Sequence, residues 1–240
     1  SVRRLTISAQ VEKLTANAAA IVDMLNDSHS GVRQAVVQTL ARLPAEELTA
    51  HAPAIVGKLE HEVSGVRQAA VEALAKLPAK ALAAHAPAIV GKLEDEDSYM
   101  RRAAVHALAQ LPAEAFATHA PVIVGKLEDE DEVVRMYTAI ALAQLPAEAL
   151  AAHAPAIVGR LKDSDSGVRE AAAKALATLP AEALAAHAPA IVGKLEHSDS
   201  EVRQTAVEAL AQLPAEALAA HAPAIVGRLK DSDSGVREAA

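Results

Sequence analysis

The chain has 240 residues, 52% of them hydrophobic, and it contains no cysteine and no tryptophan. Its 31 acidic residues outnumber its 23 basic residues, which gives a formal net charge of −8 with histidine neutral. This balance argues against nucleic acids and anionic membrane surfaces as partners, because both are bound through clustered Lys and Arg. The sequence has no apolar run of the ~20 residues that a membrane span needs, and its start lacks the apolar core of a signal peptide. Without cysteine there is no disulfide or thiolate chemistry, and we expect a cytoplasmic location if the chain is natural.

A sequence unit recurs along the chain with a period of 34 residues. The Leu-Pro pairs that mark this period are Leu43-Pro44, Leu77-Pro78, Leu111-Pro112, Leu145-Pro146, Leu179-Pro180 and Leu213-Pro214. A fixed period of this size predicts a solenoid, in which each unit buries its apolar face against its neighbours. We expect residues 1–240 to form a single solenoid. It would consist of a degraded amino-terminal cap (1–26), six repeats (27–230) and the truncated start of a further repeat (231–240), which is left uncapped unless another molecule completes it.

Each unit is predicted to be a hairpin of two helices. Pro78 suits the first turn of the first helix, where its missing N–H would be unpaired anyway. Pro87 removes a hydrogen bond inside the same helix, so we expect a kink or break at that point. Asp97 follows in an acidic turn and is expected to cap the second helix, which runs from about Ser98 to Gln110.

The second helix carries one apolar stripe at helical spacing. In one copy this stripe consists of Val66, Ala70, Ala73, Leu74 and Leu77. We expect it to face the neighbouring helices of the stack. Phe116, Met100 and Thr138 replace residues at inward positions of other copies, so they are also predicted to be buried.

The pattern D-x-D-x-x-V-R-x-A-A-x-x-A-L-x-x-L from Asp163 to Leu179 resembles the second half of a HEAT-like repeat. The proline-bent first helix is similar to that family as well, and the resemblance covers the chain from about residue 9. It implies an all-α fold, a right-handed α-solenoid of two-helix HEAT-like repeats, with first helices on the convex side and second helices lining the concave side. Tetratricopeptide repeats share the period but need large aromatic residues that this chain lacks.

The resemblance also implies that the Val-Arg arginines and the loop aspartates support packing between units. The arginines are Arg33, Arg67, Arg101, Arg135, Arg169, Arg203 and Arg237. The aspartates are Asp97, Asp131, Asp165, Asp199 and Asp233. His29 and Val63 replace the aspartate in the first two loops, so we expect weaker helix capping there. The copies are so nearly identical that the chain resembles a recent duplication or an artificial, consensus-built HEAT-like array, and we favour the second.

The copies differ mainly on one face of the second helix, at positions i, i+3, i+4, i+7 and i+11. Most copies carry Gly, Glu, Gln, Lys or Ala on this face, which lies opposite the core stripe. Two adjacent copies depart from this pattern and carry Tyr99, Arg102, His106, Val133, Met136, Tyr137 and Ile140. Exposed aromatic and apolar residues with a polar rim are typical of an interaction surface.

These residues predict a non-catalytic protein-binding scaffold that uses the concave face of the second helices, centred on the third and fourth repeats. The alternative is a structural array that self-associates through the same residues or through its uncapped carboxyl end, without a specific ligand. Neutral drift and altered packing between units also remain open as explanations of the differences.

Three recurring features suggest chemistry, but none has the required spacing. The histidines of one series are His51, His85, His119, His153, His187 and His221. They are expected to lie one unit apart, too far to share a zinc ion, and to bond the backbone beside each proline. The acidic loops lack the spacing of a calcium loop, and the glycines of each Ile-Val-Gly segment lack that of a phosphate loop. These glycines are expected to let the first helix pack close to its neighbour. We therefore predict no enzyme activity, no catalytic residue, no cofactor and no metal.

Overall fold

The computed structural model describes residues 16–240, and the chain forms two compact units that divide between Phe116 and Ala117. Both units consist of α-helices joined by short turns, and residues 16–240 contain no β-strand. The part of the predicted amino-terminal cap that precedes residue 16 lies outside the described residues. That residues 1–240 form one continuous solenoid, and that its concave side is lined by second helices, stay predictions.

The helices alternate between the two members of each repeat. The first helices are α2 (Ala18–Asp23), α4 (Ala45–Gly57), α6 (Ala79–Val90), α8 (Ala113–Gly125), α10 (Ala147–Arg160), α12 (Ala181–Val192) and α14 (Ala215–Gly227). The second helices are α3 (Ser30–Leu40), α5 (Ser64–Leu74), α7 (Ser98–Leu108), α9 (Glu132–Leu142), α11 (Ser166–Ala177), α13 (Ser200–Leu210) and α15 (Ser234–Ala239). Among residues 16–240, six short 3-10 helices follow first helices: η1 (Met24–Asn26), η2 (Lys58–Glu60), η3 (Gly91–Glu94), η4 (Lys126–Glu128), η5 (Gly193–Glu196) and η6 (Arg228–Lys230).

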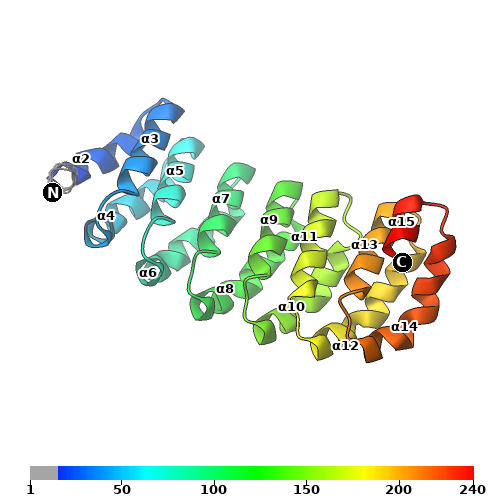
Figure 1. The fold of residues 1–240 in the computed structure, drawn as a ribbon. Coiled ribbons are helices and arrows are strands. Elements are labelled where there is room, and N and C mark those ends of the chain that lie inside the picture. The colour runs from blue at the N-terminus through cyan, green and yellow to red at the C-terminus, as the bar shows by residue number, and fades with distance from the viewer. Residues whose placement is uncertain (1–15) are drawn as a thin grey trace, which may run out of the picture. The chain divides into compact units, whose positions relative to one another are not determined.

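Each unit has two layers of helices (Figure 1). In the amino-terminal unit, α3, α5 and α7 lie side by side in one layer, and α2, α4 and α6 form the other. In the carboxy-terminal unit, α9, α11, α13 and α15 form one layer, and α10, α12 and α14 lie in the other. The predicted all-α solenoid of two-helix repeats is therefore confirmed.

The core lies between the two layers and is made mainly of Leu, Ile, Val and Ala. All five residues of the predicted apolar stripe on the second helix are buried. Met100, Phe116 and Thr138 are buried as predicted, and the Thr138 hydroxyl donates a hydrogen bond of 2.8 Å to the Val134 carbonyl. Each buried leucine contributes roughly 1.5–3 kcal/mol to the free energy of unfolding, relative to an exposed leucine. The stability of the stack is therefore the sum of many modest contributions.

The proline inside the first helix does not break it. Helix α6 continues from Ala79 to Val90 across Pro87, whose ring is exposed. The predicted break is wrong because the proline costs one backbone hydrogen bond, while Leu82, Ala86 and Ile89 hold both halves of the helix in the core. Pro78 takes the N-cap position, with a ψ of 140°, one residue before the first-turn position that we expected.

The glycines of the Ile-Val-Gly segments do not serve close packing. A Cβ atom would meet nothing within 4 Å at Gly57, Gly91, Gly125, Gly159, Gly193 or Gly227. The expectation that they bring the first helix close to its neighbour is therefore wrong. These glycines mark the place where most first helices tighten into a 3-10 turn. At Gly91 the backbone has φ −56° and ψ −23°, a conformation that any residue adopts.

We expect Gly91→Ala to raise the free energy of unfolding by about 0.5–1 kcal/mol, because it restricts the unfolded chain without strain or collision. Gly65→Ala is the matched control. Its new methyl group would overlap the guanidinium of Arg33, which is held by hydrogen bonds to the carbonyls of Gly65, Asp27 and Ser28. This variant should lose about 1 kcal/mol or more. Urea denaturation followed by circular dichroism measures both values, and a destabilised Gly91→Ala would contradict this account.

Candidate functional site

The loop before each second helix fixes the amino end of that helix. An Asp97 carboxylate oxygen accepts a hydrogen bond of 2.9 Å from the Tyr99 N–H, and Asp131 accepts bonds from Val133 and Val134. Helices α11, α13 and α15 are capped by an aspartate in the same way. Helices α3 and α5, which begin after His29 and Val63, have no side-chain cap. This difference in capping confirms the sequence prediction.

The recurring arginine joins the loops of successive repeats. In α5, Arg67 Nη1 donates to the His61 and Glu62 carbonyls of its own loop, at 3.0 and 3.1 Å. Its Nε and Nη2 donate to the Asp95 carboxylate of the next loop, at 2.8 and 2.6 Å. Arg135 with Asp163, and Arg203 with Asp231, repeat this bidentate geometry. The packing role that the resemblance implied for these arginines is thus present in the structure.

The aspartate that binds the arginine lies two residues before the capping aspartate. Asp97 and its equivalents were predicted to fill both roles, whereas Asp95, Asp163 and Asp231 bind the arginines. The signal was present, because the D-x-D motif holds two aspartates at fixed positions. The first aspartate of the motif faces the preceding repeat, and the second faces the helix that it caps.

The aspartates of these pairs remain ionised to low pH. For Asp95 and Asp163, burial acts most strongly and would raise the pKa. The hydrogen bonds from Arg67 and Arg135, with those from the loop backbone, outweigh it and hold the pKa below its usual value. Arg203, followed by the Asp233 N–H, lowers the pKa of Asp231 to about 2. The pairs are therefore charged throughout the physiological range.

The seven predicted site residues lie on two helices, one in each unit. Tyr99, Arg102 and His106 lie on α7, and Val133, Met136, Tyr137 and Ile140 lie on α9. The sequence placed all seven on one variable face of the second helices, opposite the core stripe. The structure distinguishes among them, because some are exposed and others are partly covered by their neighbours.

On α7, the aromatic ring and the guanidinium form a pair. Tyr99 is 59% exposed, and the Cζ atom of Arg102 lies 4.8 Å from the centroid of its ring. Such a cation–π contact contributes about 0.5–1 kcal/mol at an exposed site. It also limits the rotamers of both side chains, so this part of the face is preorganised.

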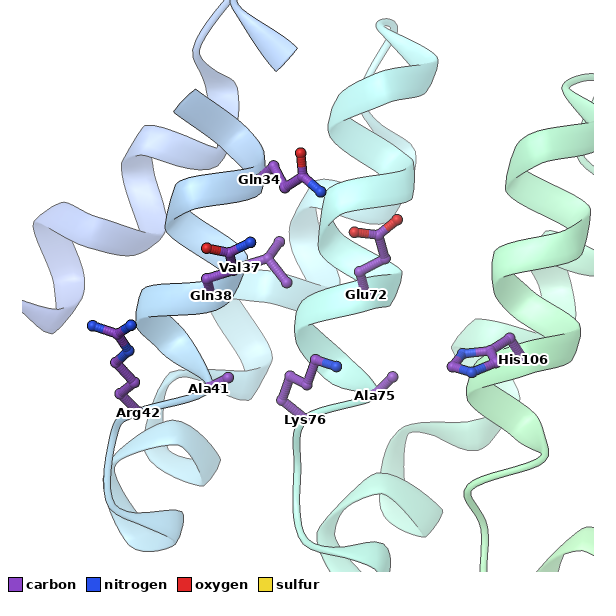
Figure 2. Close-up of a pocket in the computed structure, with 9 residues that line it drawn as sticks. All are labelled: Gln34, Val37, Gln38, Ala41, Arg42, Glu72, Ala75, Lys76 and His106. Carbon is purple, nitrogen blue, oxygen red and sulfur yellow. The ribbon is translucent and has the colours of Figure 1, made fainter. Parts of the chain in front are cut away.

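His106 lines an open groove with residues of α3, α5 and the turns that follow them (Figure 2). The groove has a volume of about 620 Å³ and is lined by Gln34, Val37, Gln38, Ala41, Arg42, Glu72, Ala75, Lys76 and His106. The sequence prediction included His106 but not the other lining residues. Arg42 and Lys76 stand where later repeats carry Gln or Thr, and this difference in charge was the signal that could have found them.

On α9, the apolar residues differ in exposure. Ile140 is 46% exposed, whereas Val133, Met136 and Tyr137 are half-buried. The sulfur of Met136 lies 3.0 Å from the point where a Cβ would stand on Gly167 of α11. Met136 therefore packs on the neighbouring repeat, which supports altered packing between units as part of the explanation for this residue.

The histidine series is half-buried, and its members make no hydrogen bond with other described residues. The prediction that each of these rings bonds the backbone is therefore wrong. One side of each half-buried ring is open to solvent, which can satisfy the ring nitrogens. Within residues 16–240, no three His, Asp or Glu side chains are close enough to hold a metal ion. No helix among these residues has both the length and the apolarity needed to cross a membrane.

We expect Asp95→Ala to lower the free energy of unfolding by about 2 kcal/mol, because it leaves two buried N–H groups of Arg67 without their charged acceptor. Glu96→Ala is the control. It removes the same charge from the same loop, but the Glu96 side chain is 87% exposed and lies 3.7 Å from Arg67. Its effect should stay within about 0.5 kcal/mol in urea denaturation at neutral pH. Equal effects of the two variants on the free energy of unfolding would show that the Arg67–Asp95 pair has no special role in stability.

The arginine–aspartate pairs also predict an acid transition. A carboxyl whose pKa is lowered on folding contributes stability above its unfolded pKa, and that stability is lost as pH falls through the folded value. For Asp231 this window extends from the ordinary 3.8 down to about 2. Urea midpoints measured through this range should fall steeply for the wild type and less steeply for Asp231→Asn. Parallel curves would contradict the prediction.

Comparisons with known proteins agree with this geometry. A family model described as HEAT repeats matches residues 18–86 and 120–188, more than half of the chain. A model of HEAT-like repeats matches residues 166–213, and one of HEAT repeats associated with sister chromatid cohesion matches residues 223–240. No curated protein sequence matches the chain.

Solved structures of engineered proteins from the Northeast Structural Genomics Consortium share the fold. One is 28% identical with a TM-score of 0.57, and the match covers 80% of this chain and 94% of that protein. A second, also 28% identical, has a TM-score of 0.59 and is matched over 92% of this chain and 65% of its own. A third is 25% identical with a TM-score of 0.57, over 80% and 96% of the two chains. With its two-helix repeats, its loop arginines and these family matches, the chain belongs to the HEAT-repeat family.

Proposed function

We propose that this chain is a non-catalytic scaffold that binds a protein partner through the outward face of its second helices. The recognition residues would be Tyr99, Arg102 and His106 on α7, with Val133, Met136, Tyr137 and Ile140 on α9. The observation that carries the proposal is the exposure of large apolar side chains where other repeats carry small or polar ones. Tyr99 is 59% and Ile140 46% exposed, whereas the residues equivalent to Ile140 in α5 and α13 are the glutamates Glu72 and Glu208.

The chemistry of these side chains fits a protein interface. Tyr and Arg are the residue types that most often carry binding energy at interface centres, since they bury a large area with few rotatable bonds. The stacked pair of Tyr99 and Arg102 already has its geometry in the free protein, which lowers the entropy cost of binding. Met136, with its flexible thioether, suits a surface that adapts to its partner.

The helices that carry these residues are rigidly held. Asp97 caps α7, and Arg101 in the same helix donates to the Asp95 and Glu96 carbonyls. Asp131 caps α9, and Arg135 joins it to the loop before α11. The side chains of each helix are therefore presented from an element that is fixed within its own unit, as a recognition surface requires.

Self-association through the same residues is the second candidate function. Tyr99 and Ile140 are 59% and 46% exposed, and a second copy of the chain would cover them in place of a different protein.

The decisive variant introduces, at three positions, residues that other repeats carry at the equivalent place: Tyr99→Glu, Tyr137→Ala and Ile140→Glu. We expect immobilised wild-type protein to retain a partner, identified by mass spectrometry after crosslinking and remeasured in purified form by calorimetry. The triple variant should lose at least about tenfold in affinity, since two exposed apolar anchors and one aromatic ring are removed. Its melting temperature should change little, because surface substitutions rarely alter stability by much.

Val122→Ala is the matched control. Val122 is 47% exposed on α8, in the layer of first helices, and the equivalent residue in other repeats is alanine. This variant should bind like the wild type. A partner retained equally by the triple variant would overturn the proposal. A molar mass that rises with protein concentration in light scattering, with no partner retained, would favour self-association instead.

A further inference from the structure

The groove in the amino-terminal unit combines an apolar floor with a basic edge. Val37, Ala41 and Ala75 form the floor between α3 and α5, and their small side chains leave the space open. Arg42, Lys76 and His106 come from three successive repeats and lie along the same edge in Figure 2. Gln34 and Glu72 lie towards the other end of the groove in the same view.

The two cations of this edge have no acidic partner. Neither Arg42 nor Lys76 forms an ion pair or hydrogen bond with another described residue, although the chain as a whole carries a net charge of −8. Lys76 lies one helical turn after Glu72 without pairing with it. The Glu72 carboxylate instead accepts a hydrogen bond of 2.9 Å from the Gln68 amide. Two positive charges are therefore left for a ligand at the carboxyl ends of two adjacent helices.

A purely structural role does not explain these cations well. A basic residue after the carboxyl end of a helix is favoured by the helix dipole, by about 0.3–1 kcal/mol. The equivalent residues of later repeats, however, are Gln110, Gln144, Thr178 and Gln212, and their helices form without a cation there. Basic side chains at this position are confined to the two repeats whose helices form the groove.

We infer that this groove binds an acidic peptide segment in an extended conformation, laid across α3 and α5 towards α7. Packed helices lie about 8–10 Å apart, which sets the separation between Arg42 and Lys76. A polyproline II segment rises about 3.1 Å per residue with three residues per turn, so carboxylates at i and i+3 share a face about 9 Å apart. One carboxylate would pair with Arg42 and the next with Lys76. The amides of Gln34 and Gln38 and the ring of His106 would bind the peptide backbone.

This site stands apart from the proposed recognition residues on α7 and α9. It shares only His106 with them, and its two cations lie in the turns that follow α3 and α5. The failure of either idea can therefore be seen separately. Tyr137→Ala should leave peptide binding unchanged, whereas substitution of Arg42 and Lys76 should abolish it.

The test uses an octapeptide, Pro-Pro-Glu-Pro-Pro-Glu-Pro-Pro, blocked at both ends and carrying a neutral fluorophore. Fluorescence anisotropy at low ionic strength should show saturable binding to the full chain. Replacing both glutamates by glutamine, or combining Arg42→Gln with Lys76→Gln, should weaken binding at least about tenfold through the loss of charge-assisted hydrogen bonds. The glutamine peptide should lose nothing further on the doubly substituted protein, because the two changes remove the same pairs.

The matched control combines Lys80→Gln with Lys162→Gln. It removes the same charge from exposed lysines outside the groove, so its affinity should stay within about twofold of the wild type. Three results would overturn the inference: no binding of the acidic peptide, equal loss in this control, or equal binding of a peptide with adjacent glutamates. Because Arg42 and Lys76 are exposed and unpaired, an unchanged melting temperature will show that the double variant is folded.

Discussion

The structure depends on one interaction, the bidentate ion pair by which Arg67, Arg135 and Arg203 each join a second helix to the next loop. When two charges are buried, the free energy lost by removing them from water nearly cancels the free energy gained by pairing them. The pair therefore adds little net stability. Breaking it is costly, because it leaves a buried charge without its partner. The arginine thus fixes the register between repeats. Where Arg67 meets Asp95, four hydrogen bonds hold two loops to one side chain.

This constraint explains differences between copies that are unrelated to binding. The loop before α5 has His61, and the loop before α13 has His197, where Asp95 stands in a standard repeat. Arg33 then donates to the Gly65 carbonyl, and Arg169 pairs with the Glu201 carboxylate. Residue 201 belongs to the variable face, yet its carboxylate takes over the role of the missing loop aspartate. Variation on that face therefore has two sources, and only some of it concerns recognition.

The features that follow from local periodicity could be predicted from the sequence. The features that depend on contacts between repeats, or on the balance between packing and hydrogen bonding, could not. The 34-residue period and the apolar stripe through Val66 and Leu74 predicted the repeats, the core and the aspartate caps. The outcome at Pro87 required knowing that packing outweighs one lost hydrogen bond. The exposure of Tyr99 and Ile140 followed from helical spacing, but the partial burial of Met136 depends on Gly167 in the next repeat. The groove needs three repeats at once, so no single copy could reveal it.

The same architecture explains how one chain can carry surfaces of different chemistry. Each repeat contacts only its neighbours, so a substitution on the outward face changes stability locally and leaves the loop pairs intact. Tyr99 can replace a glycine because the N–H that Asp97 caps is in the backbone, not in the side chain. Arg42 and Lys76 can replace glutamine because their positions lie beyond the last helical turn and outside the core. The aspartates and arginines of the loops hold the frame, and the outward face is free to vary in charge and size as long as those pairs are kept.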